Sequence, residues 1–465
     1  MARGGGVKGR LPTRQLLGFR VQTAGGNSPA MGLPSFHPHY RDLHAELLAR
    51  PFPVVAAPVM VSHRAILRGA AHEEGHRRAV AEARVLAGAA GILADSPDFQ
   101  LLRLGQVDLR IEWHHEFTSF TLIAPVGAQP GAAPPFAALA HDLLPAGWLE
   151  VIPGELIASV EMASEHVSLS RAGTPEEMER IAGLFAGGRL VGGWVIDRVA
   201  SVWSHFRLDA AGASRFLIQD HRLTPGRFGR LIQRLLEIET YRLMALLGLP
   251  LAREYLPKIE ELERSHADLV ERLGVAPGAG ADEQTLLADL TSLAVQAERL
   301  QARGESRFAV TAAYARILSD RVRELREVQV PGYQTIGEFF DRRMTMALTT
   351  CGAAHARLQE LTGRIHSSTG LLRTRVEVNL QNQNQHLLAS VDRRSATQLQ
   401  LQHAVEGLSV VILTYYLVGL LQHLVEATKV TGLHLDAELL SGLAVVPVGV
   451  AVWWSVRRVH HAHRH

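Results

Sequence analysis

The sequence is poor in cysteine and has almost no net charge. Cys351 is the one cysteine among 465 residues, which excludes a disulfide within the chain and a cysteine-based zinc cluster and fits a reducing compartment. Its place in a helical stretch is more typical of packing than of a nucleophile. The 48 basic and 46 acidic side chains leave a net charge of +2, so no basic domain or stripe is available to bind nucleic acid.

Several other signals are missing. Residues 1–30 are rich in glycine and arginine and lack the apolar run of a signal peptide. We therefore expect a disordered extension, with either Met1 or Met31 as the native start. There is no Walker loop and no Gly-x-Ser-x-Gly elbow, and residues 4–9 match a dinucleotide-binding pattern by letter only, because no strand precedes them. The sequence predicts no cofactor and no catalytic set.

What the sequence does have is a strongly apolar carboxyl end. Residues 439–456 carry no charged side chain over 18 positions. At about 1.5 Å per residue, such a helix covers roughly 27 Å of a hydrocarbon core about 30 Å thick. Trp453 and Trp454 close this run and Arg457 and Arg458 follow it, as is typical of a membrane interface.

A second apolar run precedes the first in the chain. Residues 408–421 are apolar over 14 positions, and extension to 404–427 gives spanning length with polar residues near both ends. Alone, a run of about 14 residues is typical of a buried core helix. Its pairing with the next run favours a hairpin of two transmembrane helices over residues 404–456.

Basic residues set the expected orientation. Arg393 and Arg394 precede the apolar run 408–421, and more basic residues lie in the tail 457–465. The connection 422–438 holds one lysine. The positive-inside rule then places the body and the basic, His-rich tail in the cytoplasm. We expect a protein of the bacterial inner (cytoplasmic) membrane with both termini cytoplasmic, whose first partner is the lipid bilayer.

The body divides into two parts, which makes the predicted fold class α+β. Residues 31–223 alternate strand-like and helix-like segments and predict a cytoplasmic α/β domain. Its strand-like segments are 53–62, 99–123 (two strands joined near Gly105), 148–162, 191–208 and 215–220, and its main helix is 70–90.

Residues 224–403 predict a helical domain with a long stalk helix. Helical patterns cover 227–247, 282–326 and 333–363. The last pattern begins near Arg364 and has no proline before the apolar run 408–421. One helix of roughly 95 Å could therefore extend to Ala427. A helix of that length needs neighbours, which indicates a bundle or a homo-oligomer.

One segment of the α/β domain favours a ligand site. In a strand over residues 109–120, Arg110, Glu112, His114, Glu116 and Thr118 would share one face. Such a row could bind an anion or a divalent metal, or hold a tuned proton donor. The alternative is a solvated face with cross-strand ion pairs.

Other polar patterns have simpler interpretations. His72 to His76 reads His-Glu-Glu-Gly-His and matches a zinc motif, but Gly75 is unfavourable in a helix and no third ligand is evident, so a solvated helix face is the better interpretation. His37, His39 and His44 have a spacing that fits no zinc finger. We therefore predict no metal site.

Two helical patterns favour contacts between helices. Arg234 and Glu237 are spaced to pair on one helix surface. The amide-rich residues 381–385 could form a polar layer that sets register in an oligomer, or line a pore.

Five segments carry a family resemblance: residues 44–52, 109–121, 229–247, 371–416 and the closing WWSVRRV. In these the chain resembles an uncharacterised bacterial family of predicted membrane-anchored proteins, a domain of unknown function, over about residues 35–460. The resemblance implies a membrane-anchored protein of the cell envelope and no activity. The architecture is also loosely similar to CorA-type magnesium channels, but their Gly-Met-Asn signature is absent, so no pore residues are assigned.

These features lead us to expect a membrane-anchored, cytoplasmic-facing protein that acts as an oligomeric scaffold or sensor. The alternatives are a CorA-like ion channel or transporter, and an enzyme that uses the Arg110–Glu116 strand face. The sequence does not define a small-molecule or ion ligand.

Overall fold

The computed structural model describes residues 36–46, 50–69, 71–126, 134–145, 147–274, 280–428 and 437–462. The predicted extension 1–30 and residues 429–436 of the connection 422–438 lie outside these residues. The chain divides into two compact units. Unit 1 contains residues 1–236 and 328–333, and unit 2 contains residues 237–327 and 334–465. Helix α4 (Pro225–Leu246) begins in the first and ends in the second.

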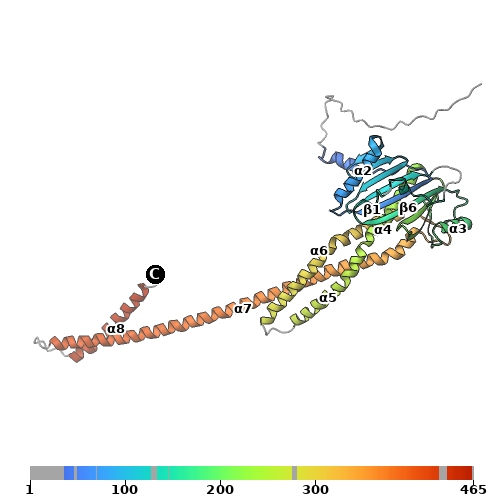
Figure 1. Cartoon of the computed structure of the whole chain (residues 1–465). Helices are drawn as coiled ribbons and strands as arrows, with labels where there is room; N and C mark the ends of the chain where they lie inside the picture. Colours follow the sequence, from blue (N-terminus) through green and yellow to red (C-terminus); the bar gives the residue numbers. More distant parts are fainter. Residues whose placement is uncertain are drawn as a thin grey trace, which may run out of the picture. The chain divides into compact units, whose positions relative to one another are not determined.

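Unit 1 is built on a mixed sheet, which confirms the predicted mixed α/β region. Within the described residues, ten strands follow the order β10-β7-β8-β9-β6-β1-β5-β4-β3-β2. Strands β1 and β6 are neighbours in this sheet (Figure 1). Strands β6 and β9 pair in parallel, and the other neighbours are antiparallel. The strands are β1 (Val59–Leu67), β2 (Ile92–Ser96), β3 (Phe99–Leu104), β4 (Val107–Trp113), β5 (Phe117–Pro125), β6 (Leu156–His166), β7 (Val191–Val195), β8 (Ala200–Leu208), β9 (Ser214–Asp220) and β10 (Val328–Gln329).

The register divides the sheet into two faces, because paired residues point to the same side. Ser62 of β1 lies opposite Leu122 of β5 and Glu161 of β6. Leu122 belongs to an apolar cluster that includes Ala83 of α2 (Glu73–Gly91) and Ala140 of η1 (Ala140–Leu143). Further along the same side, Leu217 of β9 packs with Ile181 of α3 (Pro175–Leu184). We call this side the helix-covered face.

Prolines and turns account for where the strands differ from prediction. The expected strand 53–62 begins only at Val59, after Pro53 and Pro58, because proline lacks the amide that a ladder hydrogen bond needs. The expected strand 148–162 is wrong in its first half: residues 148–151 form a turn, and the strand begins at Leu156, after Pro153. The segment 99–123 holds three strands instead of two, since the chain turns between Trp113 and Phe117.

Unit 2 is a bundle of long helices. Helices α5 (Gly248–Gly274) and α6 (Gly280–Glu324) pack with the first part of α7 (Ile336–Thr428). Cys351 of α7 is 3% exposed and belongs to their common core. Burial raises the pKa of its thiol, which agrees with a packing role. Other core residues are Tyr255, Ile259 and Leu262 of α5, Leu290, Leu293 and Phe308 of α6, and Leu358, Leu361 and Ile365 of α7.

Helix α7 starts at a well-capped end. The Thr335 hydroxyl accepts from the amide of Glu338 (3.1 Å), and the Glu338 carboxylate accepts from the amide of Thr335 (3.2 Å), which is a capping box. The Glu327 carboxylate also accepts from the amides of Ile336 and Gly337, both at 2.8 Å. Burial raises the pKa of Glu327, although these two hydrogen bonds oppose the shift.

A polar contact marks where α7 leaves the bundle. Arg375 Nε pairs with Glu283 of α6 at 2.9 Å, and Asn379 Nδ2 donates to the same carboxylate at 3.0 Å. Arg375 Nη1 also donates to the carbonyl of Leu273 at the end of α5 (3.1 Å). From Leu380 to Val405 every side chain of α7 is exposed.

The structure joins the two predicted patterns 333–363 and 364–427 into one helix of 93 residues. The capping box at its start and the absence of proline after it explain this continuity. Helix α8 (Ala437–Ala462) packs along the end of α7 (Figure 1). Among the described residues, α7 is the one helix long and apolar enough to cross a membrane.

Close packing of α4 gives a stability prediction for unit 1. A Cβ added at Gly229 would lie 1.7 Å from the carbonyl oxygen of Pro53, whereas one at Gly226 would meet only the end of Arg230 at 3.7 Å. We expect Gly229→Ala to lower the free energy of unfolding by about 1–3 kcal/mol through overpacking. Gly226→Ala should be neutral or slightly stabilising, because alanine favours a helix. Urea denaturation of both variants measures the difference, and equal values would contradict this packing.

Candidate functional site

The predicted strand face is divided by the turn between β4 and β5. Arg110 and Glu112 lie on β4, on the side opposite the helix-covered face. Trp113 pairs with Thr118 across the turn, so Thr118 falls on the helix-covered face and not beside Arg110. His114 and Glu116 belong to the turn itself. The structure therefore brings Arg110 and Glu112 together but does not extend their row through His114 and Glu116.

Arg110 and Glu112 form a buried ion pair. Arg110 is 4% exposed, and its Nη2 lies 3.0 Å from Glu112 Oε1. The Arg110 guanidinium also lies over the ring of Phe99, 4.8 Å from its centroid. Both charged groups thus have partners inside the sheet, which resembles a structural pair more than an open ligand site.

Two histidines, the buried His63 and the half-buried His114, lie on or near this face, and both are neutral at physiological pH. Burial first, then the charges of Arg50 and Arg68, lowers the pKa of His114 to about 3. Burial, then the charges of Arg64 and His114, lowers the pKa of His63 to about 3. An imidazole with such a pKa has already lost at pH 7 the imidazolium proton that a general acid would donate. His114 stacks on Phe117 with ring centroids 4.2 Å apart, and His63 Nδ1 lies 2.8 Å from Thr121 Oγ1.

The zinc-like motif is divided between a helix end and the core. His72 occupies the N-cap position of α2, while His76 is fully buried. His76 Nε2 lies 2.5 Å from the carbonyl oxygen of Pro153 and therefore carries the proton, since a carbonyl only accepts. Its Nδ1 then accepts from the Thr118 hydroxyl at 3.0 Å. Burial lowers the pKa of His76, although the bond to Pro153 opposes the shift.

This packing explains the glycine inside the motif. A Cβ at Gly75 would lie 2.2 Å from the ring of Pro153, so the glycine lets α2 approach this loop. In the described part of the chain, no group of three or more His, Cys, Asp or Glu side chains could hold a metal ion.

A polar cluster on the helix-covered face contains residue types that occur in hydrolases. Glu161 of β6 is 1% exposed, pairs with Arg64 Nη2 at 2.7 Å and accepts from the Ser62 hydroxyl at 2.5 Å. His141 of η1 places its Nδ1 3.1 Å from Ser62 Oγ and 3.4 Å from Glu161 Oε1. A catalytic triad needs the serine on one ring nitrogen and the acid on the other. Here both approach Nδ1, so this geometry does not activate Ser62.

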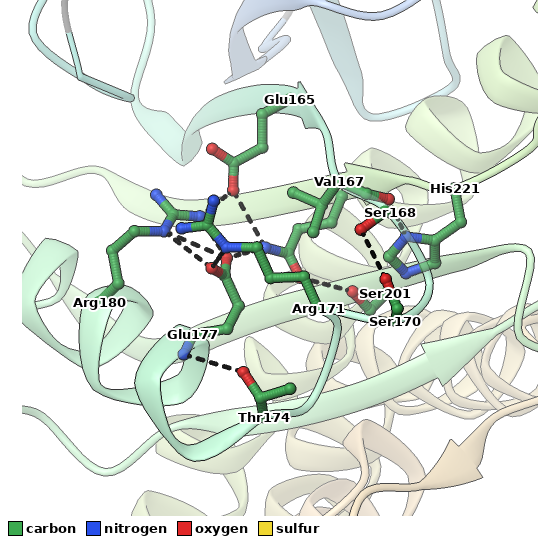
Figure 2. Close-up of polar contacts among 11 residues, drawn as sticks. Glu165, Val167, Ser168, Ser170, Arg171, Thr174, Glu177, Arg180, Ser201 and His221 are labelled. Carbon is green, nitrogen blue, oxygen red and sulfur yellow. Dashed lines mark hydrogen bonds and ion pairs between the residues drawn. The ribbon is translucent and has the colours of Figure 1, made fainter.

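A second cluster on the same face surrounds Glu177 of α3, whose side chain is fully buried (Figure 2). Arg171 Nε donates to Glu177 Oε2 at 2.6 Å, and Gln219 Nε2 of β9 donates to Oε1 at 2.6 Å. Arg180 lies between Glu177 and Glu165 of β6 and pairs with both. Ser201 Oγ of β8 completes the network by donating to Gln219 Oε1 at 2.8 Å.

Electrostatics keep Glu177 ionised. Burial raises its pKa, but the hydrogen bond and charge of Arg180, the hydrogen bond of Gln219 and the charge of Arg171 outweigh burial and lower the pKa below its ordinary value. Two carboxylates and two guanidinium groups balance in charge. The cluster holds α3 and the loop before it against β6, β8 and β9.

Sequence reasoning missed the carboxylates of β6. Glu161 and Glu165 are four residues apart in β6, so they share one face of the strand. Buried acids of this kind require cationic partners. The even spacing was a usable signal, but the partners Arg64 and Arg180 come from distant segments.

The fold and these clusters define a mixed-sheet unit that continues into a helical unit with a long exposed helix. The chain belongs to the family described as "Protein of unknown function (DUF3422)", whose model matches residues 35–463. No curated protein matches the chain. A structure titled "structure of the full-length CmaX protein" matches 71% of this chain and 93% of that chain, with 14% sequence identity and a TM-score of 0.17, which is too low to support a fold assignment.

The buried imidazole gives a prediction that separates packing from zinc binding. We expect His76→Ala to lower the free energy of unfolding by about 2–4 kcal/mol, because it leaves a cavity and two polar groups without their partner. His72→Ala, at the helix end, should change it by less than about 0.5 kcal/mol. Thermal denaturation with zinc analysis of each variant tests this. Equal losses accompanied by loss of one bound zinc would favour the metal interpretation instead.

Glu177 gives a second prediction. We expect Glu177→Gln to lower the free energy of unfolding by about 3 kcal/mol, because Arg171 and Arg180 lose their buried counter-charge. Glu179→Gln on the exposed side of α3 is the control and should be near neutral. Since the folded-state pKa is lowered, the contribution of Glu177 is present above the unfolded pKa of about 4.3 and is lost as the pH falls through the folded value. A variant as stable as the control at pH 7 would rule out this role.

Proposed function

We propose that this protein is a membrane-anchored scaffold or sensor, with its sheet and helical bundle in the cytoplasm and its two carboxyl-terminal helices in the bacterial inner membrane. The observation that carries the proposal is the apolar part of α7. An 18-residue window there has a mean hydropathy of 1.9, and none of it is buried inside the structure.

Exposure of this segment to water would be unfavourable. Leu408, Val411, Tyr415, Leu420 and Leu424 are each more than 60% exposed. Soluble proteins rarely leave a contiguous apolar surface of this kind uncovered. A lipid environment covers it on all sides, which suits a helix that is apolar around most of its circumference.

Polar residues of α7 lie at both ends of an apolar segment whose length is close to the thickness of a membrane. His403 and Glu406 form one pair at 3.4 Å, and His423 and Glu426 form another at 3.6 Å. From Glu406 to His423 the helix rises about 26 Å, close to the hydrocarbon thickness of about 30 Å.

Helix α8 supplies the second proposed span. Gly449 faces Thr414 of α7, where an added Cβ would lie 3.6 Å from the threonine methyl group. Small residues at such contacts let membrane helices approach closely. The Thr414 hydroxyl donates to the carbonyl of Val410 at 2.7 Å, so its hydrogen bond is made within α7.

The end of α8 is suited to a membrane interface. The guanidinium groups of Arg457 and Arg458 lie 4.9 and 4.8 Å from the ring centroids of Trp453 and Trp454. These four residues line a hollow of about 450 Å³. Indole rings favour the headgroup region, and arginines beyond them favour the cytoplasmic side.

A scaffold or sensor role is supported by unit 1. The charged side chains of its described polar clusters have partners within the unit, as Glu161 and Glu177 illustrate. Such satisfied networks make a sheet rigid and specific in shape. A rigid domain on a membrane anchor is suited to holding or sensing a partner.

Membrane fractionation tests the anchor. We expect the full chain to stay in the membrane pellet after alkaline carbonate and to leave it only in detergent. Aspartates in both proposed spans, at Leu413 and Leu417 of α7 and at Val446 and Val450 of α8, should release the chain from the membrane, because each acid costs about 2.5–3.5 kcal/mol at the centre of a span. The matched control places aspartates at Ser390 and Gln400 of the exposed stalk and should remain in the pellet. Recovery of the unaltered chain in the supernatant would contradict the proposal.

Liposomes separate this role from a CorA-like channel or transporter. The anchor proposal expects no flux of divalent ions through purified protein in vesicles, whereas a channel gives protein-dependent flux. An enzyme that used His114 would instead lose its cellular phenotype in a stably folded His114→Ala variant.

A further inference from the structure

The stalk of α7 carries a stripe with the spacing of a coiled-coil seam. The residues of this stripe, from Leu380 to Ile412, follow one another at intervals of four and three residues in alternation. This is the heptad repeat, whose average spacing is 3.5 residues per turn. The seam positions are Leu380, Asn384, Leu387, Val391, Arg394, Gln398, Leu401, Val405, Leu408 and Ile412.

From this stripe we infer that the stalk forms a two-stranded, parallel, in-register coiled coil with a second copy of the same chain. The residue types at the seam carry the inference. Every apolar residue at one set of alternate positions (Val391, Val405, Ile412) is β-branched, and every apolar residue at the other set (Leu380, Leu387, Leu401, Leu408) is leucine. β-Branched residues at the a positions with leucine at d favour two parallel strands.

The polar seam residues fit the same partner. Asn384 occupies an a position, where a buried asparagine pairs with its counterpart and fixes the register of a dimer at some cost in stability. Gln398 occupies another a position and can pair in the same way. Arg394 lies at d, where its aliphatic stem can line the seam while its charge reaches water.

No element of the chain itself covers this seam within the described residues. Leu387, Leu401 and Val405 are each 63% exposed. Helix α8 contacts α7 at Thr414, which lies about 200° around the helix from the seam residue Ile412. The seam thus stays open on the side away from α8.

The surface in water approaches what a dimer needs. A fully buried aliphatic side chain removes roughly 60–120 Å² from water. The five apolar seam residues outside the proposed span then remove roughly 600–1,200 Å² in two copies, which reaches the lower end of the range of about 1,200–2,000 Å² for specific interfaces. These residues are Leu380, Leu387, Val391, Leu401 and Val405, and Leu408 and Ile412 extend the contact into the membrane. The parallel direction rests on the proposed function, because two copies anchored in one membrane enter it from the same side.

Disulfide trapping tests the inference in the full chain. Cys351→Ala removes the natural thiol, and single cysteines then replace Leu387, Leu401 or, as control, Ala396 on the opposite side of the heptad. After oxidation of membranes, we expect covalent dimers for Leu387→Cys and Leu401→Cys and only background for Ala396→Cys. Trapping at both seam positions requires parallel, in-register strands, since antiparallel strands bring identical residues together at one level only.

The outcomes are distinguishable. Membrane-bound chains without dimers at either seam position overturn the coiled coil and leave the anchor intact. If Ala396→Cys gives as much covalent dimer as the seam variants, the disulfides arise from random collisions and the coiled coil is overturned. Dimers of a chain that carbonate removes from the membrane support the coil and contradict the anchor.

A second measurement avoids cysteine variants. The unaltered chain in detergent should have the mass of two copies, and Leu387→Glu with Leu401→Glu should halve that mass. The control pair Ala389→Glu with Ala396→Glu, both outside the seam, should leave the mass unchanged. A monomeric unaltered chain, or a dimer insensitive to the seam substitutions, refutes the inference.

Discussion

The structure depends on one constraint: the apolar surface of α7 must be covered along a helix that has neighbours in its own chain for only part of its length. From Ile336 to Leu372 the cover is protein, since α5 and α6 pack against residues such as Leu358 and Ile365. Beyond Asn379 that cover ends. We propose that a second copy covers the stalk and lipid covers the terminal part. Each segment of α7 has the composition that its proposed surroundings require. The bundle part has an apolar stripe that faces the core, the stalk has amides and a narrow apolar seam, and the terminal part is apolar around most of its circumference.

The sheet of unit 1 obeys a different constraint, which concerns charge. Its central strand β6 carries two carboxylates on the helix-covered face, and the opposite side holds Arg110 with Glu112. Burial of an unpaired charge is costly. Glu161 and Glu165 therefore have guanidinium partners from other segments, Arg64 and Arg180, and Glu112 pairs with Arg110 of its own strand. The pairs of β6 connect α3 and β1 to the sheet centre, and His141 connects η1. The arrangement makes unit 1 specific in shape without placing an activated nucleophile among the polar clusters described here.

Much of this fold could be predicted from local signals. The mixed α/β region, the long helices and the hairpin between β8 and β9 follow from periodicity and turn residues; Asp209 accepts from the amides of Ala211 and Ala213 at that turn, both at 2.9 Å. The row from Arg110 to Glu116 could not be predicted correctly, because a three-residue turn reverses the alternation after Trp113. The pairing of Glu177 with its arginines was also inaccessible, since it depends on which distant strands become neighbours. His76 illustrates the same limit, because its role follows from the loop at Pro153, 77 residues away.

Because α7 is one continuous helix, the number of residues in its stalk can change only in certain steps. The bundle face near Leu358 and the α8 face near Thr414 belong to one helix, so their relative angle is set by the number of residues between them. Inserting or deleting one residue would rotate one face against the other by about 100°. An insertion of seven or eleven residues rotates it by only about 20°. Related chains should therefore differ in stalk length by such steps, and single-residue changes should be confined to the loops.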